Sequence, residues 1–179
     1  MQSISIFVLL YAVRGEVFML KISMFEFLLR GLPEAFLFVF AAFALTRTKL
    51  DVKKYFLASL ILASVAYLVR FLPIQYGVNS ILIIFVIIVM MNIIFKIDMI
   101  AAIRTGITII IIEYICEGIN VFLIQVVMKI DMNYVFSNAD LKVLYGLPSL
   151  AIFGLIMVLY YTKIASRKGL RVITDGEIQ

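Results

Sequence analysis

The chain has 179 residues, of which 65% are apolar and 15% are charged. Soluble globular domains hold roughly 45–50% apolar and about 25% charged residues, and disordered chains need low hydrophobicity, so both classes are excluded. The composition therefore indicates an integral membrane protein. In such a protein a formal charge of +5 is expected to reflect basic cytoplasmic loops and not nucleic-acid binding.

Residues 1–23 are an ambiguous leader. The apolar stretch Ile4–Val13 is shorter than the roughly 20 residues that a spanning helix needs, and Arg14 and Glu16 follow it directly. A basic start and a small-residue cleavage site are both missing, so a signal peptide is not expected. The leader is therefore a sixth spanning helix, an interfacial segment, or an extension upstream of a chain that starts at Met24.

Residues 24–166 are expected to form an all-α bundle of five transmembrane helices, or six with the leader. Every backbone group in lipid must be paired within its own segment, so even stretches rich in Ile and Val are predicted to be helical. The five expected spans are Phe25–Leu45, Tyr55–Leu72, Ser80–Phe95, Met99–Met128 and Leu147–Tyr161.

The last two spans and the loop between them carry local signals. At 1.5 Å per residue the fourth span would be about 45 Å long, so it is expected to tilt, to protrude or to break at Gly118. The loop contains the sequence Ser137-Asn-Ala-Asp140, which is similar to a capping box. Residues 138–144 are therefore either a short interfacial helix or a simple connector. Pro148 is expected in the first turn of the fifth and shortest span.

Basic residues are distributed unevenly between the two sides of the predicted bundle. If the spans alternate in direction, one side holds ten basic residues, in two loops and in the carboxyl-terminal segment from Lys163 onward, and the other side holds four. The positive-inside rule places the richer side in the cytoplasm. We therefore expect a multi-pass protein of the cell membrane with a cytoplasmic carboxyl terminus.

Ionisable residues inside the spans are the strongest signal, since each costs about 2.5–3.5 kcal/mol at the centre of the bilayer. One helix face of the first span carries three of them at intervals of four residues, beside Pro33, which is expected to kink the helix. Together with polar residues of the second and fourth spans, they are candidate ligand-binding residues around an outward-facing cavity: Glu26, Arg30, Glu34, Arg70, Glu113, Glu117 and Asn120. The alternative, favoured for Glu26 and Arg70, is that arginine–glutamate pairs only lock the helices together.

Catalysis is not expected from this composition. The chain has no histidine and a single cysteine, Cys116, which lies in an apolar run. Nucleophilic catalysis needs an activating partner, and zinc sites are seldom built from carboxylates alone. The sequence therefore predicts a protein that is not an enzyme and that has no metal site or cofactor.

Three segments resemble parts of the amino-terminal sensor regions of AgrC-type peptide-sensing histidine kinases of Gram-positive bacteria. They are Phe25-Glu-Phe-Leu-Leu-Arg-Gly-Leu-Pro-Glu34, Arg70-Phe-Leu-Pro-Ile-Gln-Tyr-Gly77 and Tyr145-Gly-Leu-Pro-Ser149. The resemblance covers about residues 24–168 and implies an outward-facing helical sensor that binds an extracellular signal peptide. Only eleven residues follow Lys168, so a kinase domain is not expected, and the signal would pass to a membrane or cytoplasmic partner.

Two main functions are compatible with these observations. The first is a sensor-like membrane module that binds a peptide or a small cationic ligand from the outer side and relays the event to a partner. The second is a small transporter, or the substrate-binding subunit of a larger one. A membrane chaperone or assembly partner is a third possibility, with no distinctive sequence trace.

Overall fold

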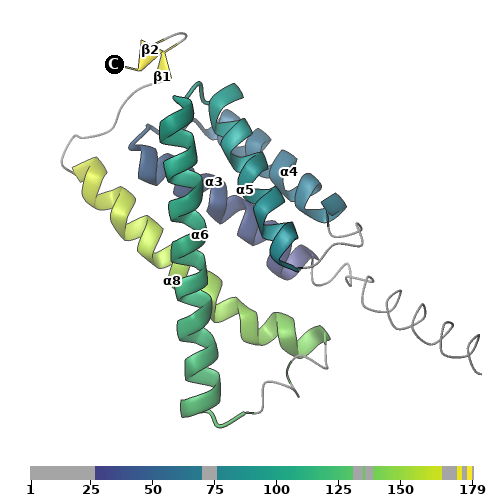
Figure 1. The fold of residues 1–179 in the computed structure, drawn as a ribbon. Coiled ribbons are helices and arrows are strands. Elements are labelled where there is room, and N and C mark those ends of the chain that lie inside the picture. Colours follow the sequence, from purple (N-terminus) through teal and green to yellow (C-terminus); the bar gives the residue numbers. More distant parts are fainter. Residues whose placement is uncertain are drawn as a thin grey trace, which may run out of the picture.

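A computed structural model describes residues 27–69, 76–130, 135, 139–166, 173–174 and 177–178. Within these residues five α-helices form the fold (Figure 1): α3 (Leu32–Thr46), α4 (Val52–Val69), α5 (Tyr76–Ile93), α6 (Met99–Phe122) and α8 (Ala139–Ser166). A π-helical turn, η1 (Phe27–Gly31), leads into α3, and a second, η2 (Leu123–Val127), continues α6. Near the end of the chain, β1 (Ile173–Thr174) and β2 (Glu177–Ile178) pair antiparallel.

The chain is an all-helical, multi-pass membrane protein. Four helical segments are long and apolar enough to cross a membrane: Phe27–Thr46, Val52–Val69, Met99–Val127 and Val143–Ile164. In α5 the apolar segment Ile81–Ile93 is shorter than a span. The described residues therefore support four of the five crossings expected from the sequence and do not establish a five-span bundle.

Helix α3 lies at the centre of the bundle and contacts α4, α6 and α8, while α5 packs on α4 and α6. Its alanines are buried, which allows the neighbouring helices to approach closely. Aromatic pairs join it to distant parts of the chain. The rings of Phe43 and Phe95 lie 4.6 Å apart, and those of Phe38 and Phe153 lie 5.9 Å apart. The core thus holds one long face of α3 against segments from the second half of the chain.

The fourth span is one continuous helix of 29 residues, Met99–Val127, which is about 43 Å long. The break that the sequence suggested at Gly118 is absent, and this glycine is exposed with no atom close to the position of a Cβ. In Figure 1 the far end of α6 runs beyond α3, α4 and α5 and is crossed only by α8. The excess length is therefore accommodated by protrusion from the rest of the bundle.

Helix α8 corrects three expectations. It starts at Ala139, so Pro148 lies inside the helix and not in its first turn. Residues 139–144 are its first turns, and neither a separate interfacial helix nor a connector. With 28 residues, α8 is the longest α-helix in the described part of the chain and not the shortest. A proline removes one N–H donor and crowds the preceding turn, but α8 continues through Pro148 and packs against both α6 and α3.

Some expectations lie outside the described residues. The leader at residues 1–23, the start of the first span at Phe25 and Glu26, and Arg70 belong to this group, as does most of the tail at residues 167–179. The sequence led us to expect a kink at Pro33. The irregularity found next to it is the π-helical turn η1, which ends two residues before this proline.

Gly106 and Gly118 provide a matched test of the packing of α6. A Cβ at Gly106 would lie 3.0 Å from Cγ1 of Ile88 on α5, whereas a Cβ at Gly118 would meet nothing within 4 Å. We expect Gly106→Leu to destabilise the protein by about 1–3 kcal/mol, because overpacking forces helices apart. Gly118→Leu should leave stability nearly unchanged. Reversible unfolding in mixed micelles measures both, and equal effects would contradict the packing of α5 on α6.

Candidate functional site

Five of the seven candidate residues lie in the described part of the chain, and two helices carry them. Arg30 is in η1 and Glu34 is in the first turn of α3, while Glu113, Glu117 and Asn120 are on α6. The structure brings these five residues together where the start of α3, the second half of α6 and the first half of α8 meet. We term them the polar cluster.

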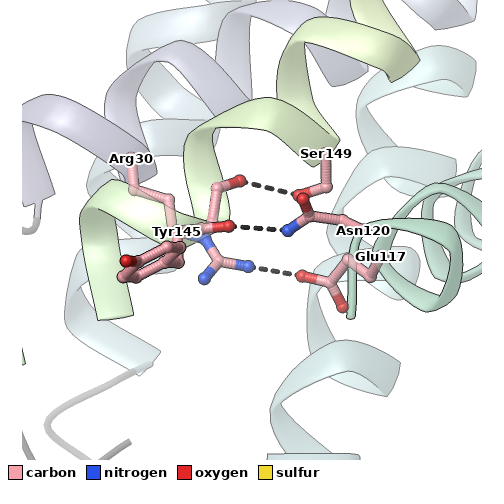
Figure 2. Close-up of polar contacts among 6 residues, drawn as sticks. Arg30, Glu117, Asn120, Tyr145 and Ser149 are labelled. Carbon is pink, nitrogen blue, oxygen red and sulfur yellow. Dashed lines mark hydrogen bonds and ion pairs between the residues drawn. The ribbon is translucent and has the colours of Figure 1, made fainter. Parts of the chain in front are cut away.

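An ion pair between Arg30 and Glu117 links η1 to α6. Nη2 of Arg30 donates a hydrogen bond to Oε1 of Glu117 across a sequence separation of 87 residues (Figure 2). The arginine side chain is 18% exposed and the glutamate side chain is 35% exposed. The pair is therefore partly shielded, which makes it stronger than a surface ion pair while leaving one side accessible.

Helix α8 completes the cluster through its backbone. Nδ2 of Asn120 donates to the carbonyl oxygen of Tyr145 at 2.6 Å, and Oγ of Ser149 donates to the carbonyl oxygen of Gly146 at 2.7 Å. Figure 2 shows both carbonyl groups in the turn of α8 that faces Arg30 and Glu117. Pro148 lies in the same turn and has no N–H to offer. The side-chain donors thus supplement the backbone bonding of α8 next to its proline.

Gly146 is a functional position that the sequence reasoning missed. A Cβ at this residue would lie 2.6 Å from Nη1 and 3.1 Å from Cζ of Arg30, so the guanidinium group occupies the space that any other side chain would take. The segment Tyr145-Gly-Leu-Pro-Ser149 was singled out only for its resemblance to sensor regions and for its proline. Its glycine carried no signal of contact with a residue more than a hundred positions away.

Two carboxyl groups meet behind the ion pair. Glu34, Glu117 and Arg30 are all near enough to act electrostatically on the carboxyl group of Glu113. Glu113 is only 8% exposed. The cluster thus combines three acidic groups with one guanidinium group.

The cavity at the cluster is much smaller than the sequence suggested. Glu34 lines a cavity of about 10 Å³ between α3, α4 and α5, together with Gly31, Ala35, Phe38, Leu62, Ala66 and Ile83. A single water molecule needs about 10–15 Å³. The outward-facing, ligand-sized cavity that we expected is therefore not formed beside Glu34, and a ligand could enter there only if the helices moved apart.

A reactive thiol and a metal site are the two other kinds of site that this region could contain. Cys116 is buried in the core with its thiol free. Within the parts of the chain that the structure describes, no three residues among His, Cys, Asp and Glu are grouped so that they could hold a metal ion. The described part of the cluster therefore consists of one ion pair with two further acids beside it.

The contact between Gly146 and Arg30 gives a direct test of the cluster. We expect Gly146→Ala to displace the guanidinium group and to weaken the pair with Glu117, which should destabilise the protein by about 1–3 kcal/mol. In the Arg30→Gln background the same alanine should cost much less, and this difference is the coupling that a double-mutant cycle measures.

Gly154→Ala is the matched control, because its Cβ would meet only Leu37, at 3.1 Å, and not a charged group. Additive effects of Gly146→Ala and Arg30→Gln would contradict the proposed contact.

Comparison with known proteins does not identify a relative of this chain. No protein-family model matches the chain, and no curated protein or solved structure is significantly similar to it. The functional argument therefore depends on the polar cluster itself.

Proposed function

We propose that this chain is a sensor-like module of the cell membrane that binds a cationic group from the outer side and relays the event to a signalling partner. The ligand would be a small amine or the basic end of a peptide. The observation that carries the proposal is the partly exposed ion pair between Arg30 and Glu117, which joins η1 to α6. Two further acids, Glu34 and Glu113, lie behind it.

Ligand binding would work by exchange. An ammonium or guanidinium group that reaches Glu117 competes with Arg30 for the same carboxylate oxygens. Because the ion pair of Arg30 and Glu117 joins η1 to α6, an incoming cation that replaces Arg30 breaks this link and allows the two segments to separate. A ligand that binds only the separated state shifts the equilibrium toward it. Binding and helix movement are therefore the same event in this proposal.

Helix α6 offers a route for the relay. It is continuous from Asp98 at one end of the bundle to η2 at the other, so a tilt at Glu117 moves both ends. Asn120 bonds α6 to α8, which couples the two helices. The basic residues around the α3–α4 and α5–α6 turns support an inner location for those turns, with the polar cluster toward the outer side.

The resemblance to AgrC-type sensor regions is consistent with this assignment. Two of the three similar segments supply residues of the site. The first contains Arg30 and Glu34, and the third contains Tyr145, Gly146 and Ser149. An extracellular peptide is the ligand class that this resemblance favours.

The test is a thermal-stability titration of the purified chain in nanodiscs with arginine amide, spermidine and a short basic peptide. Binding to the folded state stabilises it by about 2.7 kcal/mol when the ligand is present at 100 times its dissociation constant. We expect at least one of these probes to raise the melting temperature, and Glu117→Gln to abolish the rise.

Asp51→Asn is the control for loss of one negative charge. Asp51 caps α4 at the opposite end of the bundle, and asparagine caps helices equally well. This variant should keep the full response. If none of the three probes stabilises the chain, or if Glu117→Gln responds like the wild type, the proposed cation site is wrong.

A proton-coupled carrier, or the binding subunit of one, is the second candidate. The two acids Glu34 and Glu113 beside the ion pair support it, because carboxyl groups inside a membrane bundle commonly mark proton and cation pathways. In vesicles with the reconstituted chain, a pH gradient should then drive spermidine uptake that Glu113→Gln abolishes. Uptake equal to that of empty vesicles would exclude the carrier acting alone.

A further inference from the structure

One end of the bundle carries seven basic side chains, six of them exposed and one, Lys54, half-buried. We term them the basic collar: Arg47, Lys49, Lys53, Lys54, Lys96, Arg104 and Lys163. In Figure 1 the end of α3, the start of α4, the end of α5 and the start of α6 gather at this end. The hydroxyl group of Tyr161 accepts a hydrogen bond from the backbone N–H of Leu50 at 3.2 Å, which brings the end of α8 to the same place.

The acidic residues of this end are engaged in capping helices. Oδ1 of Asp51 accepts hydrogen bonds from the backbone N–H groups of Lys53 and Lys54, at 3.0 and 3.4 Å. Oδ2 of Asp98 accepts from the first turn of α6, at 3.1 and 3.4 Å. Over residues 46–54, 96–104 and 161–166, seven basic residues therefore face only two acids. This end has a clear excess of positive charge.

The backbone favours glycine at two collar positions, yet a basic residue occupies each. Arg47 has φ of 57° and Lys96 has φ of 51°, both in the left-handed region. Arg47 ends α3, where its N–H bonds to Ala44 and the N–H of Thr48 bonds to Phe43. Glycine is the usual residue at such helix ends. A residue other than glycine strains the backbone at this position. A cationic residue at the C-terminal end of a helix interacts favourably with the helix dipole, which offsets part of this strain.

Tyrosines mark the depth of the collar in the membrane. Tyr55 and Tyr161 are half-buried on the bundle side of it, and the hydroxyl group of Tyr55 donates to the carbonyl oxygen of Phe36 at 3.2 Å. Tyrosine is enriched where the hydrocarbon core meets the headgroups. Tyrosines at this end therefore favour a position of the collar close to the lipid phosphates.

From this arrangement we propose that the basic collar binds the phosphate groups of anionic phospholipids and thereby stabilises the α3–α4 and α5–α6 turns. The interaction is independent of the polar cluster, which lies at the other end of α6. Its ligand is a lipid headgroup and not free phosphate, because cations from five helix ends gather at one end of a membrane-spanning bundle. A bound lipid headgroup can therefore contact several basic side chains of the collar at once.

The test compares phosphatidylglycerol with phosphatidylcholine, titrated into the full chain in neutral detergent, with bound lipid counted by native mass spectrometry. We expect preferential binding of phosphatidylglycerol, a higher melting temperature in its presence, and loss of both effects at high salt. Removal of one collar charge should weaken binding by about fivefold.

Glycine variants separate the loss of a collar charge from a disturbance of the turn that carries it. Arg47→Gly and Lys96→Gly each remove a charge at a position whose backbone glycine accepts without strain, so the turns should still form. Lys129→Gly is the matched control, because Lys129 also has a positive φ, of 54°, but lies beyond η2 at the opposite end. We expect the two collar variants to lose affinity for phosphatidylglycerol and the control to retain it.

Three results would overturn the proposal. One is equal binding of the two lipids by the wild type, and another is an equal loss of affinity in Lys129→Gly. The third is the same rise in melting temperature with inorganic phosphate as with phosphatidylglycerol, because the collar would then be a site for free phosphate. None of these results depends on whether cationic ligands bind at Glu117.

Discussion

A guanidinium group between membrane helices needs a counter-charge inside the bundle, because hydrocarbon offers it neither water nor hydrogen-bond acceptors. Arg30 meets this requirement with Glu117, and the packing of three helices follows from that contact. Helix α6 must present its glutamate toward η1, and α8 must leave space for the guanidinium group at Gly146. The ion pair therefore determines which faces of α6 and α8 turn inward near the far end of the bundle.

Departures from regular helix geometry surround this contact. Arg30 itself lies in the π-helical turn η1, and α8 contains Pro148 three residues after the Tyr145 carbonyl group that Asn120 bonds. Such irregular turns are frequent at functional sites, because they leave backbone groups available and allow helices to change direction. The contact between η1, α6 and α8 is thus built from the parts of these helices that are most easily rearranged.

The two ends of the bundle differ in how their charges are used. At one end, aspartates cap α4 and α6, and six of the seven basic collar side chains are exposed. At the other end, Arg30 and three glutamates interact mainly with one another inside the bundle. The first arrangement is suited to a fixed position at a charged membrane surface. The second is suited to a change of state, because replacing one charge alters the balance of the whole cluster.

The sequence by itself determined the membrane class, the helical fold and the approximate positions of the helices, because apolar stretches of about 20 residues indicate spanning helices whatever their neighbours are. The bounds of several helices differ from the expected ones, most of all at the start of α8. It also identified the polar residues inside the spans. The spacing of Glu113, Glu117 and Asn120 places them on one face of any helix, whatever that helix packs against. Only the tertiary structure decided that Arg30 pairs with Glu117, 87 positions away. It also decided that Gly146 makes room for this pair, that α8 continues through Pro148, and that the cavity at Glu34 is small. Those outcomes depend on how distant helices pack, and local periodicity carries no information about that.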